Sequence, residues 1–309
     1  MPALQVRPFR RDDRDQLTEL VNAHVAAVVP GVSVSVNTVL GRLARRPDEF
    51  ITDPWVAERV TLVAEQRSFV VAAAHLLRYR TGAEVGPDYQ GMGAIDWFVS
   101  HPSASFWPDA DTAADLLMSA CLAQLARWDV RVREADGALP APAVYGLPRA
   151  WPHVRAVYER AGFRHTGHTE VVLIAAVPDL PTPPAPVAGL ALRRTLGECG
   201  TRLTAHLDGH DLGFIEVDTA LGRPERQARN GSLADIGNLR TEPHHGVDGL
   251  HAWLLGEAAR WLRLAGADRL LAYESADDTR ALALLKHLGF TELVRTDRGW
   301  RQVSGSVRR

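Results

Sequence analysis

The chain has 309 residues, of which 46% are hydrophobic, and a formal net charge of -2. This length suits two globular domains of ordinary size. Because 35 basic residues are balanced by 37 acidic ones, the chain offers no basic surface for duplex nucleic acid, which is therefore not an expected partner. The two cysteines, Cys121 and Cys199, form neither a disulfide framework nor a CxxC metal motif.

Targeting and phosphate-loop signals are missing from the sequence. No run of 18 apolar residues occurs, and the first residues lack the hydrophobic core of a signal peptide. We therefore expect a cytoplasmic protein with no membrane partner. Lys286 is the only lysine, so the sequence cannot contain a Walker phosphate loop, which requires a lysine at a fixed place.

Hydrophobic periodicity predicts an alternation of strands and helices in the first half. The predicted strands or extended segments are 4–9, 61–65, 69–77, 94–99, 143–147 and 169–177. The predicted helices are 12–29, 36–45, 112–128 and 153–161.

A proline-rich segment, 177–186, interrupts this pattern. Its prolines cannot donate ladder hydrogen bonds, and they favour an extended, semi-rigid spacer. We expect an N-terminal domain of residues 1–177, a linker of residues 178–188 and a C-terminal domain of residues 189–309.

The second half is predicted to repeat the order of elements in a more compact form. After an extended segment at 190–194, residues 202–207 and 212–218 are expected to form a hairpin across Asp208 and Gly209. A strand at 234–240, a long amphipathic helix from Leu250 to Gly266 and a strand at 269–273 follow. The first helical region is shortened here, because little chain separates the first extended segment from the hairpin.

One short motif occurs twice, as VYERAGF at 157–163 and as LLKHLGF at 284–290. In both copies a helix ends, a Gly stands where a left-handed cap is needed, and a Phe begins the next strand. The spacing is too long for a solenoid repeat, so the motif indicates two copies of a whole domain. The predicted fold class is α/β, with a mixed, mostly antiparallel central sheet flanked by helices in each domain.

Four features of the second half carry a resemblance to a known family: the hairpin strand at 213–217, the strand at 236–241, the turn at 242–250 before the long helix, and the final Gly289-Phe290 unit. In these features the chain resembles the GNAT superfamily of N-acetyltransferases, and specifically its tandem members with two GNAT folds in one polypeptide. The likeness is looser in the first half, where it rests on residues 6–9, the element order and residues 158–163.

The resemblance implies a pyrophosphate-binding turn at residues 246–251, where the family pattern keeps its middle Gly as Gly249. Backbone N–H groups at a helix N-terminus cradle anions, and glycine permits their close approach. Asp248 counts against the site unless its carboxylate points to solvent. The implied contacts with acetyl-CoA or another acyl-CoA are Leu239, Arg240, Thr241, Gly246, Val247, Asp248, Gly249, Leu250 and Asp278.

The corresponding turn of the first half, 101–111, contains no glycine. Asp109 and Asp111 stand at the start of the following helix, and we expect their carboxylates to cap its free N–H groups. The first domain is therefore expected to bind acyl-CoA poorly or not at all.

Acyl transfer to an amine needs a group that accepts the amine proton and a group that protonates the leaving thiolate. The family commonly places a Tyr four residues before the repeated Gly for the second task, where this chain has Tyr158 in the first half and Leu285 in the second. Tyr273 is the candidate substitute, and Glu216 and Asp235 are the candidate bases. The residues alone leave open that both tyrosines only pack and that both carboxylates are ordinary strand-edge groups.

His244, His245 and His251 surround one turn, but they lack HExxH spacing and a paired acidic ligand, so no metal is expected. The resemblance implies an acyl-CoA-dependent N-acyltransferase, with the primary amine of a small molecule attacking the thioester directly in a ternary complex. Two alternatives stay open: an aminoacyl-tRNA-dependent GNAT-fold transferase, and a catalytically silent tandem-GNAT binding protein. We expect a monomer that is internally a pseudo-dimer, or a homodimer.

Overall fold

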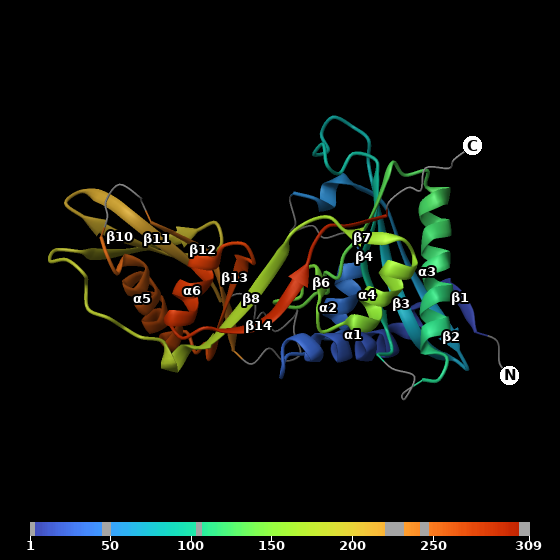
Figure 1. Cartoon of the computed structure of the whole chain (residues 1–309), viewed down its shortest axis with the longest axis horizontal. Coiled ribbons are helices and arrows are strands. Elements are labelled where there is room, and N and C mark those ends of the chain that lie inside the picture. Colours follow the sequence, from blue (N-terminus) through green and yellow to red (C-terminus); the bar gives the residue numbers. More distant parts are fainter. Residues whose placement is uncertain (1–3, 45–50, 103–106, 220–231, 242–246, 303–309) are drawn as a thin grey trace. The chain divides into compact units, whose positions relative to one another are not determined.

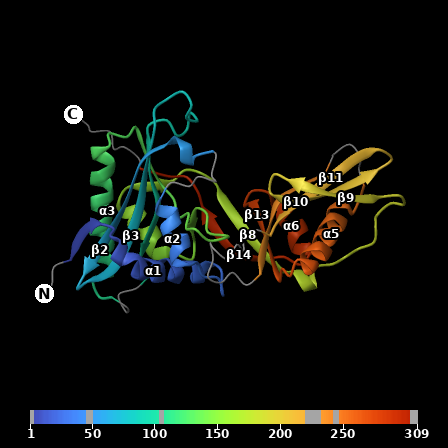
Figure 2. The ribbon, with the colours of Figure 1, turned by 180° about the vertical axis from the view of Figure 1, so that it is seen from behind.

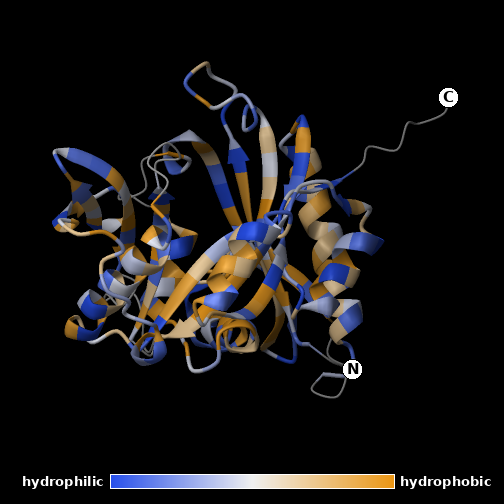
Figure 3. Ribbon diagram, turned by 60° about the vertical axis from the view of Figure 1, so that its left-hand side comes forward, coloured by the Kyte–Doolittle hydropathy of each residue, from blue (hydrophilic) through white to orange (hydrophobic). Residues whose placement is uncertain are grey.

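The computed structural model of the chain describes residues 4–44, 51–102, 107–219, 232–241 and 247–302. By its internal contacts the chain forms two compact units. Unit 1 comprises residues Met1–Thr169 together with Thr296–Arg309, and unit 2 comprises residues Glu170–Arg295. Each unit is a mixed sheet with helices packed against it, and hydrophobic residues follow the strands and the inner helix faces (Figure 3).

Unit 1 is built on a seven-stranded sheet with the order β1-β2-β3-β4-β5-β15-β7 (Figure 1). Its strands are β1 (Gln5–Pro8), β2 (Val56–Gln66), β3 (Phe69–Tyr79), β4 (Met92–Ser100), β5 (Val132–Ala135), β7 (Phe163–His165) and β15 (Trp300–Gln302). Its helices are α1 (Arg14–Val28), α2 (Val36–Leu43), α3 (Ala110–Arg127) and α4 (Pro152–Arg160), with short 3-10 turns at Arg11–Asp13 and Asp53–Trp55.

Both faces of the unit 1 sheet are covered by helices. The strands β2 and β3 lie between α3 on one side and the pair α1 and α2 on the other (Figures 1 and 2). The helix α4 stands beside α3, and the Arg160 guanidinium contacts the Asp115 carboxylate at 2.7 Å across that pair. The residues of β4 are therefore almost all buried, with only Asp96 half-buried.

Unit 2 is built on a sheet in which β14, β8, β13, β12, β11, β10 and β9 are neighbours in that order. Its strands are β8 (Thr169–Ala176), β9 (Ala191–Gly197), β10 (Gly200–Leu207), β11 (His210–Asp218), β12 (Leu233–Thr241), β13 (Arg269–Ser275) and β14 (Thr291–Asp297). Its helices are α5 (Leu250–Leu264) and α6 (Thr279–His287), with a 3-10 turn at Val177–Asp179. The last two residues of β14 belong to unit 1 and pair there with β6 (Leu147–Pro148).

The helices of unit 2 cover one face of its sheet. Apolar side chains of α5 and α6 share a single core with strand residues such as Leu203, Ile215 and Leu270. The other face of β9, β10 and β11 carries polar side chains, and no described helix of unit 2 packs on it. The cause is local: β9 and β10 form a hairpin directly through Glu198 and Cys199, whereas α1 and α2 intervene between the first two strands of unit 1.

Each unit contains one strand from the half of the sequence that otherwise forms the other unit. The strand β15, from the end of the chain, pairs with β5 and β7 and completes the sheet of unit 1. The strand β8, which follows the first copy of the Gly-Phe motif, pairs with β13 and completes the sheet of unit 2. The limits of the compact units therefore differ from the consecutive domains expected from the proline-rich segment.

The proline-rich segment packs within unit 2 instead of forming a free spacer. The Arg263 guanidinium of α5 donates hydrogen bonds to the carbonyls of Val177, Pro178 and Leu180 at 2.9–3.1 Å. A Cβ atom at Gly256 of α5 would lie 3.0 Å from Pro183, so the segment runs closely along the helix. The segment begins with the 3-10 turn Val177–Asp179, and its contacts with α5 hold it in place.

Most of the predicted elements are present. The predicted Gly caps have left-handed backbones, with φ of 84° at Gly162 and 101° at Gly289, and the Asp208-Gly209 hairpin turn is confirmed. The strand expected at 143–147 is wrong except for Leu147, because Ala143 has a φ of 64° that breaks an extended run. The short strand β5 was not predicted. Among the described helices, none combines the length and apolar character needed to cross a membrane.

Candidate active site

The strand β12 of unit 2 contains a β-bulge at Gly237. Its neighbour β11 pairs Glu216 with Asn238 and Val217 with Ile236, so Gly237 is an extra residue on β12. A Cβ atom at Gly237 would lie 2.2 Å from the Cβ of Cys199, in the turn between β9 and β10. Glycine is therefore required at the bulge, because this turn folds directly over it.

Beyond the bulge, one edge of β12 has no partner among the described strands. The parallel ladder between β12 and β13 has only three pairs and ends where Asp235 faces Leu271. From residue 236 to residue 241, β12 pairs with β11 alone among the described strands. The predicted cofactor residues Leu239, Arg240 and Thr241 lie on this part of β12, whose backbone groups on this edge have no partner among the described residues and suit an extended ligand.

The helix α5 begins next to the end of β12. The Thr241 hydroxyl lies 3.3 Å from Nε2 of His251, in the first turn of α5. Burial, and to a smaller extent the charge of Arg280, lower the pKa of His251. Because His251 is uncharged at neutral pH, only the backbone N–H groups at the helix start and the Arg280 side chain are left to attract an anion there.

The N-terminus of α5 has the features of the predicted pyrophosphate cradle. Gly249 is the N-cap with a φ of 81°, and no side chain caps the first N–H groups. A Cβ atom at Gly249 would meet no heavy atom closer than 3.9 Å, and Asp248 is exposed to solvent. Of the other predicted residues, Val247 accepts a hydrogen bond from the N–H of Leu250 at 3.3 Å, and Gly246 lies outside the described residues.

Asp278, another predicted cofactor residue, stands at the start of α6. Its carboxylate accepts a hydrogen bond from the N–H of Ala281 at 2.9 Å, which makes it the N-cap of that helix. This role stabilises α6 whether or not a ligand is bound.

Two of the predicted catalytic residues, Asp235 and Tyr273, lie close together where the ladder between β12 and β13 ends. Asp235 faces Asp218 across the β11–β12 ladder, and Tyr273 of β13 lies close enough to influence the pKa of Asp235. Burial, followed by the negative charge of Asp218, raises the pKa of Asp235 to about 7, against the smaller opposing effect of Tyr273. A carboxyl group with a pKa near 7 is suited to exchange protons at neutral pH.

The third predicted catalytic residue of unit 2, Glu216, is fully engaged in a hydrogen-bond network. Its carboxylate accepts hydrogen bonds from Asn238 at 2.6 Å and Arg202 at 2.6 Å, and from the N–H groups of Glu198 and Cys199 at 3.2 and 3.3 Å. Burial opposes its charge, but the donors, led by Asn238 and Arg202, hold the pKa of Glu216 below its usual range. This arrangement suits a structural carboxylate better than a base.

Unit 1 has the same bulge, but the opening beside it is closed. The strand β3 pairs His75 with Trp97 and Leu76 with Ile95, so Asp96 is the extra residue on β4. Past the end of β5, the N–H of Asp136 donates to the Ile95 carbonyl at 2.8 Å and that of Ala138 to the Asp96 carbonyl at 3.2 Å. These bonds continue the β4–β5 contact across the bulge.

The predicted acid of unit 1, Tyr158, is part of this closure. Its side chain is fully buried against Phe98 and Trp300, and its hydroxyl donates to the Asp136 carbonyl at 2.7 Å. Burial raises the pKa of Tyr158 well above its usual value. Its observed contacts are those of a packed tyrosine with one structural hydrogen bond.

The expectation that Asp109 caps α3 through its side chain is wrong. No side chain caps that helix, and the Asp109 carboxylate accepts a hydrogen bond from Gln66 at 2.7 Å instead. The indole N–H of Trp107 donates to the same Gln66 at 2.5 Å. The Asp109 carboxylate, which the sequence predicted to cap α3, is thus hydrogen-bonded to Gln66 of β2 instead.

Three residues of the unit 2 site were missed by the sequence analysis: Cys199, Gly237 and Asn238. An isolated Gly inside a predicted strand is a known indicator of a bulge, and Gly237 carried that signal. Cys199 and Asn238 carried none, because their importance comes from the turn that folds over the bulge. Among the described residues, no cluster of His, Cys, Asp or Glu is arranged to hold a metal ion.

No protein-family model and no curated protein matches the chain, but solved structures match nearly all of it. A tandem GNAT protein from the clavulanic acid biosynthesis pathway, solved without acetyl-CoA, has a TM-score of 0.65 at 15% identity, with 98% of this chain and 100% of that one covered. A GCN5-related N-acetyltransferase from Sphaerobacter thermophilus has a TM-score of 0.61 at 14% identity, covering 98% and 96%.

A third similar structure belongs to a longer protein. It is the GCN5-related glucosamine N-acetyltransferase region of a fungal multi-domain GH3 β-N-acetylglucosaminidase, with a TM-score of 0.64 at 12% identity. The match covers 97% of this chain and 38% of that one. The chain therefore has the tandem GNAT fold, which confirms the expected fold class and the resemblance. Identities of this size establish the fold, so the activity must be argued from the site.

Proposed function

We propose that the chain is an acyl-CoA-dependent N-acyltransferase that transfers an acetyl group from acetyl-CoA to the primary amine of a small molecule. The observation that carries this proposal is the free edge of β12, which runs from the bulge at Gly237 to the uncapped start of α5. An extended pantetheine arm needs such an edge, and a pyrophosphate needs such a helix start. The same pair of features supports unit 2 as the working half.

Acetyl-CoA, when bound, supplies the thioester that the amine attacks. The backbone N–H groups of α5 and Arg280 would hold its phosphates, and Leu239, Arg240 and Thr241 would line its arm. Asp235 accepts the proton that the attacking amine loses, since its carboxyl group exchanges protons near pH 7. Tyr273, which lies near Asp235, is the group we assign to protonating the leaving thiolate.

The remaining predicted residues receive other roles in this proposal. Glu216 holds the turn between β9 and β10 against the bulge, and Tyr158 closes the corresponding opening of unit 1. The closed opening supports the expectation that unit 1 binds acyl-CoA poorly or not at all. An aminoacyl-tRNA-dependent transferase and a silent binding protein are not favoured, because neither requires a free β12 edge beside a carboxyl group that titrates near pH 7.

The proposal is tested by calorimetric titration of acetyl-CoA into the protein and two variants. Gly249→Glu places a carboxylate at the helix start, and we expect it to weaken binding by about a hundredfold or more. Gly249→Ala has the same unfavourable left-handed backbone without the charge and serves as the matched control, with a change of about tenfold or less. If the wild-type protein binds no acetyl-CoA, or if Gly249→Glu binds it normally, the assignment to unit 2 is wrong.

A further inference from the structure

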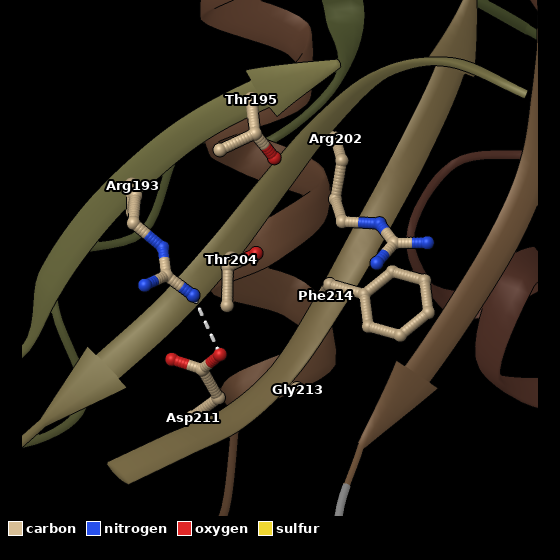
Figure 4. Close-up of a pocket in the computed structure, with 7 residues that line it drawn as sticks. All are labelled: Arg193, Thr195, Arg202, Thr204, Asp211, Gly213 and Phe214. Atoms are coloured by element: carbon tan, nitrogen blue, oxygen red, sulfur yellow. Dashed lines mark hydrogen bonds and ion pairs between the residues drawn. The ribbon is translucent and has the colours of Figure 1, made fainter. Parts of the chain in front are cut away.

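A hollow of about 290 Å³ lies on the polar face of unit 2 that its helices leave uncovered. Three neighbouring strands line it, with Arg193 and Thr195 from β9, Arg202 and Thr204 from β10, and Asp211, Gly213 and Phe214 from β11 (Figure 4). The register places Arg193 beside Thr204 and Thr195 beside Arg202. The lining therefore combines two guanidinium groups with two hydroxyl groups on one small surface.

Arg202 is held rigidly at the rim of the hollow. Its guanidinium carbon lies 4.3 Å from the centre of the Phe214 ring, and its Nε donates to Glu216 at 2.6 Å. Its two terminal nitrogens make no hydrogen bond to any other described residue, so their N–H donors are left for a ligand. A guanidinium that is stacked on an aromatic ring and fixed through Nε loses little freedom when it binds an anion.

The charged groups around the hollow form ion pairs that leave some guanidinium donors unused. Asp211 is the one acidic side chain in the lining, and it is engaged by Arg193 at 2.6 Å and by His206 at 2.9 Å. These contacts, led by the His206 hydrogen bond, lower the pKa of Asp211. Asp211 is thus paired with Arg193, and Glu216 is paired with Arg202, so these four groups carry no net formal charge. What the hollow offers a ligand is the remaining guanidinium N–H donors and two hydroxyl groups, which suit the oxygen atoms of an anionic group.

A short chain of hydrogen bonds connects the hollow to the candidate active site. Arg202 donates to Glu216, and Glu216 accepts from Asn238, the residue that follows the bulge at Gly237. These contacts run from β10 through β11 to β12 beneath the turn of Glu198 and Cys199. Further along the same strands, Asp218 of β11 pairs with Asp235 of β12.

The geometry points to an anion-binding site in this hollow, which takes the carboxylate or phosphate group of the acceptor while its primary amine extends along the strands toward Asp235. The acceptor class is then an amine that carries an anionic group at its other end. The link to acyl transfer rests on the proposed function, whereas the anion site itself does not.

Binding is measured by nuclear magnetic resonance titration without any coenzyme, using inorganic phosphate, acetate, 5-aminopentanoate and n-butylamine as probes. We expect the anionic probes to shift the signals of the hollow and n-butylamine to shift none of them. Tighter binding of phosphate than of acetate identifies a phosphate-bearing acceptor, and the reverse order identifies a carboxylate. Shifts of the same size with n-butylamine would overturn the inference.

Matched variants locate the site. Arg193→Gln removes a lining guanidinium, and Arg194→Gln removes the same charge one residue away, where Arg194 lies 4.6 Å over the Trp261 ring. We expect Arg193→Gln to weaken anion binding about tenfold and Arg194→Gln to leave it unchanged. Equal weakening by both variants would mean a general effect of charge and would refute the site.

Thr204→Val provides a second variant that keeps the charge and the side-chain volume. We expect it to weaken anion binding about threefold through loss of one hydroxyl donor. Anion binding that is unaffected by both Arg193→Gln and Thr204→Val would also refute the site. Because no coenzyme is present, a failure of acetyl-CoA to bind leaves this result unchanged, and a failure of anions to bind leaves the acetyl-CoA test unchanged.

Discussion

Units 1 and 2 share a bulge at the same place in the sheet, yet they use it differently. In unit 1 the extra residue is Asp96, and backbone hydrogen bonds with Tyr158 close the opening beside it. In unit 2 the extra residue is Gly237, and the edge of β12 beyond it stays free. A duplicated fold can therefore keep its strands and lose its opening through a few contacts at one bulge.

The coverage of the sheet differs as well. Helices α1 and α2 pack on one face of unit 1, where the strand residues are buried, whereas the same stretch of unit 2 is a two-residue turn. The network around Glu216 replaces those helices, because it ties the turn, β10 and β12 together. This comparison predicts that unit 2 depends on polar contacts where unit 1 depends on apolar burial.

The largest expected effect concerns the base. Two residues before the bulge, unit 2 has Asp235 where unit 1 has Ala94. We expect Asp235→Asn to lower kcat/KM for acetyl transfer by about 10² to 10⁴. In the wild-type protein kcat/KM should rise with pH through about 7 and then level off, because the carboxylate form of Asp235 is the proposed base. Unchanged activity in Asp235→Asn would show that another group takes the proton.

The same variant, although less active, should gain stability relative to the wild-type protein as the pH rises. The pKa of Asp235 is raised on folding, so the protein loses stability as pH rises from about 4 to about 7. Asp235→Asn removes this loss. The melting temperature of the variant minus that of the wild type should therefore be about 3 °C larger at pH 8 than at pH 5. Asp96→Asn in unit 1 is the control, with no effect on activity expected. A pH-independent difference in melting temperature would contradict the raised pKa.

The next effect concerns the network that replaces the helices. We expect Glu216→Ala to lower the free energy of unfolding by about 3 kcal/mol, because it leaves Arg202, Asn238 and two backbone donors without their acceptor. Glu292→Ala, which removes a solvent-accessible partner of Arg295, should cost less than about 1 kcal/mol. Both are measured by urea unfolding. Equal costs would mean that the network does not hold unit 2 together.

The direction of the Glu216 pKa shift adds a pH dependence. Since folding lowers this pKa, the stabilisation is present above about pH 4 and is lost as pH falls through the folded value. The difference in unfolding free energy between wild type and Glu216→Ala should therefore shrink on acidification below about pH 4. A difference that grows there would point to a protonated Glu216 in the folded protein.

The sequence predicted the fold better than the site. The Gly-Phe motif and the periodic helices are local signals, and Gly162 and Gly289 have the backbone that their positions predicted. The exchange of β8 and β15 was beyond prediction, because strand pairing between distant segments leaves no local pattern. The roles of Glu216 and Asp235 were equally unresolved, since burial and neighbours, not residue type, separate a saturated carboxylate from one that titrates near pH 7.

A smaller effect is expected at the bulge itself. Gly237→Ala places a Cβ atom 2.2 Å from that of Cys199, and we expect it to destabilise the protein by about 2 kcal/mol. Cys199→Gly removes the obstructing Cβ atom. Gly237→Ala should therefore cost much less stability in the Cys199→Gly background than in the wild-type protein. Thermal unfolding of the four proteins gives the coupling. Additive effects would show that the turn does not rest on the bulge.

The smallest expected effect tests whether the closed opening of unit 1 is purely structural. Tyr158→Phe removes one buried hydroxyl whose partner is the Asp136 carbonyl, and we expect it to lower the free energy of unfolding by about 1 kcal/mol. Because Tyr158 has no access to solvent, acetyl transfer should stay at the wild-type rate. Tyr273→Phe in unit 2 makes the same chemical change beside Asp235, and it should lower kcat with little change in stability. The opposite pattern, with activity lost in Tyr158→Phe and kept in Tyr273→Phe, would move catalysis to unit 1.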